Sequence, residues 1–109
     1  MILLFRAPFP RALLLGGLLA ATPAMDAHAV ENPTLQDIVV QCEACHGLKG
    51  KSEEKGFPSL AGKSEAHILQ QLQNFRSGKR PHEEMSYMGR SLTAEEMKAV
   101  AHYFSSLPH

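Results

Sequence analysis

The sequence lacks an excess of charge of either sign, has few cysteines and contains no long apolar run. Its 109 residues carry 11 basic and 11 acidic side chains, so its formal net charge is zero. No cluster of lysines and arginines forms the strong basic patch that nucleic acid binding requires, so no nucleic-acid partner is expected. No alternating strand pattern and no internal repeat is present, which favours a helical domain.

The main apolar run, residues 12–21, is part of a predicted export signal. It has about 10 residues, whereas a membrane-spanning helix needs roughly 20. Arg6 and Arg11 precede it, and Ala27-His28-Ala29 follows it as an A-x-A cleavage site. We therefore expect residues 1–29 to be a cleaved secretory signal peptide rather than an uncleaved anchor. No stable membrane insertion is expected after cleavage, and the product is expected to be periplasmic.

The remaining domain, residues 30–109, is small for a stable core. A domain of about 80 residues is marginal unless something reinforces it. Only two cysteines are available, Cys42 and Cys45, and a disulfide between them would close too short a loop to constrain the unfolded chain. A prosthetic group at the centre of the core would solve the size problem better.

The stretch Cys42-Glu43-Ala44-Cys45-His46 has the pattern C-x-x-C-H, by which haem c is attached to proteins. Two thiols at this spacing can add to the two vinyl groups of one haem, and the adjacent histidine can then bind the iron. A thioredoxin-like redox pair would require a βαβ pattern, which is missing. Half of a zinc site would require further ligands at fixed spacing. The motif therefore predicts one covalently bound haem c.

Three stretches have apolar residues at helical spacing: Leu35–Cys45, Ser64–Ser77 and Ala94–Ser106. Thr93 and Glu96 form a capping box before the last of them. The segments 47–62 and 79–92 are rich in turn residues and are predicted as loops. Loops of this length are unusual in a small domain, but they make sense if they wrap a prosthetic group. The predicted fold is therefore all-α, with three main helices and two long loops around one covalently bound haem.

The residues themselves narrow the choice of iron ligands. The second ring nitrogen of His46 needs an acceptor, and the carbonyl of Pro58 is well placed in sequence to supply one. On the opposite side of the iron, Met85 and Met88 are candidates, and His82 competes with them. A thioether ligand favours Fe(II) and raises the potential relative to a second histidine. The pattern leaves Met85, Met88 and His82 open as the sixth ligand.

Three segments together resemble those of a class I cytochrome c: Cys42–Gly47, Phe57–Gly62 and Ile68–Gly78. The likeness continues through residues 84–96 and 101–104, and it covers essentially all of residues 35–107. The chain is most similar to the cytochrome c4 / cytochrome c553 subgroup. Cytochrome c4 proper has two such domains in tandem, whereas this sequence has one C-x-x-C-H motif, so it resembles a monohaem relative.

The resemblance implies roles for individual residues. The implied cofactor-binding residues are Cys42, Cys45, His46, Pro58, Leu60 and Met85. His46 and Met85 would be the metal ligands, because the first methionine of the pair usually binds the iron in this subgroup, and Met88 is the alternative. Pro58 would accept a hydrogen bond from His46, and Leu60 would pack on the haem.

These expectations lead to a periplasmic single-electron carrier that is not an enzyme, because full axial ligation leaves no position for a substrate. The expected partners are redox proteins: a respiratory complex or dehydrogenase as donor, and a terminal oxidase or reductase as acceptor, met through a small transient interface. The alternative is a dedicated cytochrome subunit of a larger respiratory or dehydrogenase complex, which an exposed apolar patch would favour. Haem-based sensing or peroxidase-like catalysis would need an open sixth site.

Overall fold

The computed structural model describes residues 8, 10, 12–25 and 31–109. The chain divides into two units, residues 1–30 and 31–109. The described residues of the first unit form no helix or strand, and the predicted cleavage site at 27–29 lies outside the described residues. Within the described part of the chain, no helix is both long and apolar enough to cross a membrane.

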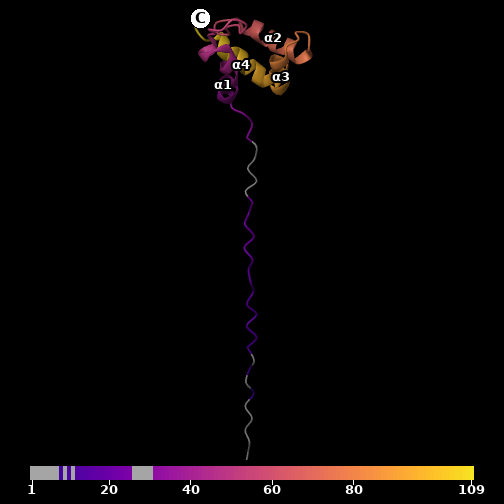
Figure 1. Ribbon diagram of the computed structural model, residues 1–109. Coiled ribbons are helices and arrows are strands. Elements are labelled where there is room, and N and C mark those ends of the chain that lie inside the picture. Colours follow the sequence, from indigo (N-terminus) through magenta and orange to yellow (C-terminus); the bar gives the residue numbers. More distant parts are fainter. Residues whose placement is uncertain (1–7, 9, 11, 26–30) are drawn as a thin grey trace, which may run out of the picture. The chain divides into compact units, whose positions relative to one another are not determined.

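All regular elements of the second unit are helices (Figure 1), and none of residues 31–109 belongs to a strand. Its elements in chain order are α1 Leu35–His46, the 3-10 turn η1 Leu48–Gly50, α2 Glu65–Ser77, α3 Glu83–Ser91 and α4 Ala94–Ser105. The all-α fold class expected from the sequence is confirmed.

Local sequence sets the ends of α1, α2 and α4. At the start of α1, the Thr34 N–H donates to the Asp37 carboxylate at 2.9 Å, and the Asp37 N–H donates back to the Thr34 hydroxyl at 3.3 Å. Hydrogen bonds from Thr34 hold the pKa of the Asp37 carboxyl below its usual range. Thr93 and Glu96 form the predicted capping box of α4. Helix α2 ends at Gly78 in the left-handed conformation, with φ of 80°.

The prediction of a loop over residues 79–92 was wrong, because most of this segment forms α3. The helix begins soon after Pro81. His82 is its N-cap, and the His82 Nδ1 accepts a hydrogen bond from the Met85 N–H at 3.3 Å. Two glutamates in the first turn interact favourably with the positive end of the helix dipole. A histidine cap and the helix-disfavouring Gly89 are weak local signals, which explains why the helix was missed.

The core is centred on α4, which packs against both α1 and α2, while α3 packs on α2 (Figure 1). The buried core cluster consists of Ile38, Val39, Ile68, Leu72, Leu92, Met97, Val100, Ala101 and Phe104. Four of these nine residues belong to α4. Leu92 and Met97 flank the N-terminus of α4 and are both buried, as a hydrophobic staple requires.

Gly89 allows the close approach of α3 to α2, and replacing it with alanine is expected to destabilise the domain. An added Cβ would lie 2.8 Å from the Arg76 backbone nitrogen and 3.1 Å from the Leu72 carbonyl oxygen. Overpacking of this kind costs about 1–3 kcal/mol, and the better helix propensity of alanine offsets about 1 kcal/mol of it. Thermal unfolding of Gly89→Ala should show a net loss of up to about 2 kcal/mol. Arg90→Ala, at an exposed position of the same helix, should stay within about 0.5 kcal/mol of the wild type; equal stability of the two variants would contradict the role of Gly89.

Candidate functional site

The last turns of α1 bring the two cysteines and the histidine of the C-x-x-C-H motif together. Cys42 and Cys45 are three residues apart, so both lie on one side of the helix. Both are free thiols; Cys42 is partly buried against the core, and Cys45 is exposed. His46 is the last residue of α1 and is buried, with 8% of its surface exposed.

His46 is oriented by a hydrogen bond to a residue twelve positions away. Its Nδ1 lies 2.7 Å from the Pro58 carbonyl oxygen, which is the contact expected from the sequence. A carbonyl oxygen can only accept, so the Nδ1 carries the proton and donates it. In the neutral ring the Nε2 then keeps a free lone pair, which is the form of imidazole that binds a metal. The geometry therefore fixes both the tautomer and the ring orientation of His46.

The segment between α1 and α2 is folded back so that Pro58 reaches His46. The Lys49 N–H donates to the Glu43 carboxylate at 2.6 Å, which fixes the chain just after α1. The Gly50 carbonyl accepts from the N–H groups of Leu60 and Ala61 at 2.8 and 3.1 Å. The bonds to the Gly50 carbonyl hold together the two ends of the exposed loop that lies between Gly50 and Leu60.

Two glycines are required in this segment. Gly47 has φ of 84°, and a Cβ there would collide with the Lys51 backbone. Gly50 has φ of 70°, and a Cβ there would lie 2.8 Å from Cδ1 of Phe104. Gly50 therefore lets the segment pass directly over the ring of Phe104, a fully buried residue of α4.

Three of the expected site residues, which come from three parts of the chain, pack against the core. Cys42 of α1, Leu60 of the connecting segment and Met85 of α3 are all partly buried and pack against the core cluster. Met88 is also partly buried, but it is not among the side chains that pack on that cluster. His82 is exposed at the N-cap of α3. The structure thus packs Met85, like Cys42 and Leu60, against the buried core cluster.

Two further histidines lie on the helices. His67 of α2 and His102 of α4 are exposed, and the His102 Nδ1 lies 3.3 Å from the Glu65 carboxylate. In the part of the chain that is described, no three His, Cys, Asp or Glu side chains are grouped so that they could hold a metal ion.

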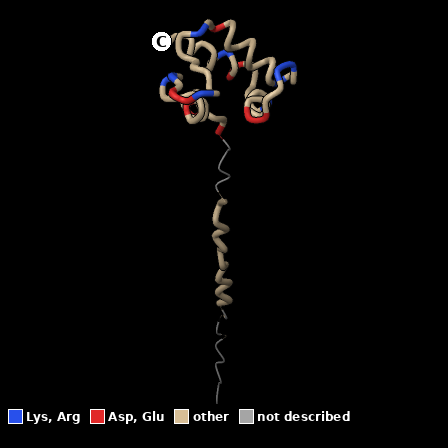
Figure 2. The backbone as a smooth tube through the Cα atoms, turned by 45° about the horizontal axis from the view of Figure 1, so that its top comes forward, with Lys and Arg blue, Asp and Glu red and all other residues tan. Residues whose placement is uncertain are grey.

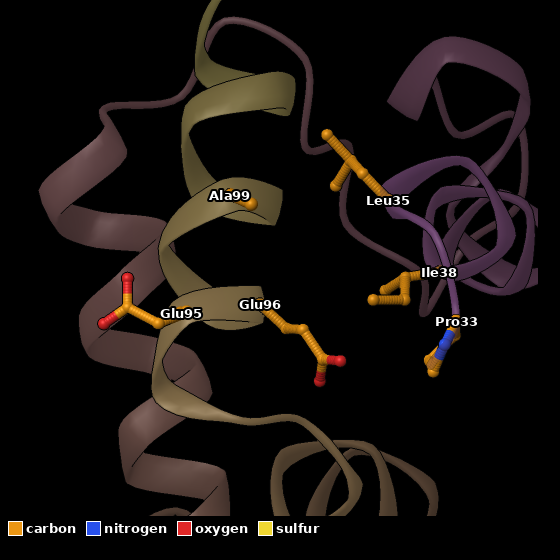
Figure 3. Close-up of a pocket in the computed structure, with 6 residues that line it drawn as sticks. All are labelled: Pro33, Leu35, Ile38, Glu95, Glu96 and Ala99. Atoms are coloured by element: carbon orange, nitrogen blue, oxygen red, sulfur yellow. The ribbon is translucent and has the colours of Figure 1, made fainter. Parts of the chain in front are cut away.

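Two pockets lie near this region. A pocket of about 560 Å³ flanks the exposed Cys45 and is lined by Ala44, Cys45, Gly47, Leu48, Lys49, Lys51, Ser52, Glu53, Glu54 and Phe57. A smaller one of about 240 Å³ lies between α1 and α4, where Leu35 and Ile38 face Ala99 and Glu96 (Figure 3). None of the expected site residues lines the smaller pocket, whereas Cys45 lines the larger one.

The residues present fit a covalently bound haem. Two free thiols lie on one side of α1, His46 offers a single free ring nitrogen, and apolar side chains remain partly exposed at the edge of the core. Leu60 and Met85 supply part of that apolar surface. Such a half-covered core suits a large apolar group, which would complete the burial.

Burial raises the pKa of the Cys42 thiol from 9.0 to about 11 in the haem-free chain. The unfolded chain releases this proton above about pH 9, while the folded chain keeps it until about pH 11. Stability of the haem-free chain is therefore fully present below about pH 9 and falls by up to about 3 kcal/mol between pH 9 and 11. Urea unfolding at a series of pH values should show this fall. It should be absent from Cys42→Ala and from the haem-bound protein, whose thioether carries no proton; a flat profile in all three would contradict the assignment.

Sequence reasoning missed a polar tether beside Pro58. The Ser59 hydroxyl accepts a hydrogen bond from the Ser52 N–H at 3.0 Å, in a partly buried position. The position of Ser59 directly after Pro58 was the only signal in the sequence, and it shows no partner. The partner is fixed by the fold of the connecting segment.

Comparisons with known proteins agree on one family. The sequence profile of the cytochrome c family matches residues 36–108. Cytochrome c4 of Pseudomonas aeruginosa is 38% identical over 65 residues, which cover 60% of this chain and 32% of that protein. A thiosulfate dehydrogenase electron acceptor of Stutzerimonas stutzeri is 36% identical over 72 residues, covering 63% of this chain and 33% of that protein.

A shorter relative is covered almost completely. Cytochrome c-553 of Helicobacter pylori is 32% identical over 82 residues, which cover 74% of this chain and 85% of that protein. The chain thus spans about a third of the length of the first two relatives and most of the length of the third.

Proposed function

Because the chain belongs to the cytochrome c family, we propose that it is a periplasmic single-electron carrier whose haem iron is bound by His46 and Met85. The family resemblance seen in the sequence is confirmed, and haem c is its covalently bound cofactor. When bound, the haem supplies a one-electron Fe(III)/Fe(II) couple. A carrier, rather than an enzyme, follows from two protein ligands that leave no open position for a substrate.

The side chains of the protein have separate tasks in this proposal. Cys42 and Cys45 hold the haem through thioether bonds, so the cofactor is not lost between encounters. His46 binds the iron through Nε2, and Pro58 keeps the ring in one orientation by accepting from Nδ1. Met85 would supply a neutral sulfur ligand to the iron, which favours Fe(II).

The observation that carries the proposal is the hydrogen bond of 2.7 Å between His46 and Pro58. It holds a buried imidazole in the metal-binding tautomer directly beside two free thiols. A redox-active disulfide pair would not need an adjacent histidine held in this way. The geometry therefore supports haem ligation over thiol redox chemistry.

The test is expression with a haem-maturation system, followed by fractionation, mass measurement and a reduced-minus-oxidised spectrum. We expect a periplasmic product whose mass equals the peptide from Val30 plus one haem, with the spectrum of low-spin haem c. An exported, folded and colourless product with two free thiols would refute the proposal. A haem-bound product in another compartment would refute only the location.

The name of one relative bears on the class of the electron donor. The Stutzerimonas stutzeri relative is named as an electron acceptor of thiosulfate dehydrogenase. We propose as donor a respiratory complex or a dehydrogenase, and as acceptor a terminal oxidase or reductase. Basic and acidic residues are interspersed along residues 31–109 (Figure 2). The rates of association with redox partners are therefore expected to depend only weakly on ionic strength.

A dedicated subunit of a larger complex is the second candidate, and it would be favoured by apolar side chains that stay exposed once haem is bound beside Cys45. Leu48 is 76% exposed and Phe57 is 40% exposed, and both line the pocket beside Cys45. Co-purification with a stable partner, lost in Leu48→Ser with Phe57→Ser and kept in Val40→Ser, would establish this candidate; recovery as a free monomer at native abundance would exclude it.

A further inference from the structure

The Pro58 carbonyl that holds His46 belongs to the peptide unit between Pro58 and Ser59. Because a peptide unit is planar, the position of Ser59 sets the direction in which this carbonyl points. The Ser59 hydroxyl is itself held, because it accepts a hydrogen bond of 3.0 Å from the Ser52 N–H. The chain of contacts thus runs from Ser52 through Ser59 and Pro58 to the ring of His46.

Pro58 has little packing of its own to hold it in place. Residues 53–58 are all exposed. The loop that contains these residues is closed by the hydrogen bonds from the Leu60 and Ala61 N–H groups to the Gly50 carbonyl. The bond from Ser52 to Ser59 is a side-chain tether, and it lies closer to Pro58 than the ties at Leu60 and Ala61. It is partly buried, so water competes for it less than at the exposed tip.

We propose that Ser59 is a positioning residue for the proximal ligand and thereby tunes the redox potential of the haem, an inference that rests on His46 being the iron ligand. The Nδ1–H bond to Pro58 raises the basicity of the ligating Nε2. A more basic ligand stabilises Fe(III) relative to Fe(II), which lowers the potential. Loss of the Ser59 tether loosens the carbonyl, weakens the bond to His46 and moves the potential upward.

The test compares Ser59→Ala with two matched variants in the holoprotein. At fixed applied potential, Ser59→Ala should raise the Fe(II):Fe(III) ratio about threefold, which is about 28 mV at 59 mV per tenfold change for one electron. Ser59→Thr keeps a hydroxyl and should restore the wild-type value. Ser52→Ala keeps the backbone donor and loses only the contacts of its own hydroxyl with Glu54, so its potential should be unchanged.

Amide hydrogen exchange supplies a readout that does not depend on the iron. The Ser52 N–H should exchange faster in Ser59→Ala than in the wild type, and at the wild-type rate in Ser59→Thr. If Ser59→Ala does not fold, Ser59→Val replaces it, since valine and threonine have the same shape and differ in the hydroxyl.

The outcomes separate the two proposals. A normal low-spin spectrum with the same potential in wild type and Ser59→Ala overturns the role of Ser59 and leaves the carrier function intact. An equal shift in Ser52→Ala also overturns it, because that variant keeps the tether. A wild-type protein without histidine-ligated haem overturns the proposed function itself.

Discussion

A chain in which Cys42 and Cys45 are both replaced by alanine is expected to be exported without covalently bound haem. Neither of the two alanines can form a thioether, and His46 alone would hold the iron only reversibly. The mass should equal that of the peptide, and a denaturing gel should show no haem stain. Because a domain of about 80 residues has a marginal core, the haem-free product should also unfold at a lower temperature than the haem-bound protein.

Ala44→Ser is the matched control for this experiment. Ala44 is exposed and lies between the two cysteines, so the substitution leaves both thiols and the helix in place. It should carry one haem at the wild-type level. Covalent haem on the double cysteine variant would show that the attachment chemistry has been assigned to the wrong residues.

Replacing Met85 with alanine is expected to open the sixth position of the iron. The sulfur-to-iron absorption band in the red should disappear from the oxidised protein. Added imidazole should bind at least about tenfold more tightly, a difference of about 1.4 kcal/mol, because it no longer has to displace a protein ligand. Visible spectra recorded during an imidazole titration would measure both effects.

Met88 and His82 provide the controls for Met85. Met88→Ala should keep the red band, since Met88 does not pack on the core cluster that Met85 contacts. His82→Ala should also keep it, while removing the N-cap of α3 at a cost of about 1 kcal/mol of stability. Loss of the band in Met88→Ala, with retention in Met85→Ala, would move the ligand to Met88.

The sequence predicted those parts of the fold whose signals are local. Helices α1, α2 and α4 have strong N-caps at Thr34, Ser64 and Thr93, each of which accepts a hydrogen bond from the first turn. Helix α3 could not be predicted in this way. Its stability depends on packing against α2. Gly89 allows this packing because it has no Cβ, whereas in the sequence alone a glycine only lowers the helix propensity of the segment.

The same distinction between local signals and contacts made by the fold holds for the candidate site. The thiols and His46 are adjacent in the sequence, so their grouping could be predicted from the motif. The contact from His46 to Pro58 could be anticipated because a proline fixes the chain. The bond between Ser52 and Ser59 depends on how the connecting segment doubles back, and no residue pattern announces it.

Met85 is carried by a helix and not by a flexible loop, and this bears on how fast the protein can exchange electrons. Helix α3 is anchored along its length by α2, and its first turn is closed by the bond between the Met85 N–H and His82. The backbone that carries Met85 is therefore held in place. If Met85 ligates the iron as proposed, its sulfur would keep nearly the same place in both oxidation states, and little atomic rearrangement would accompany each transfer, so the barrier to self-exchange would be low.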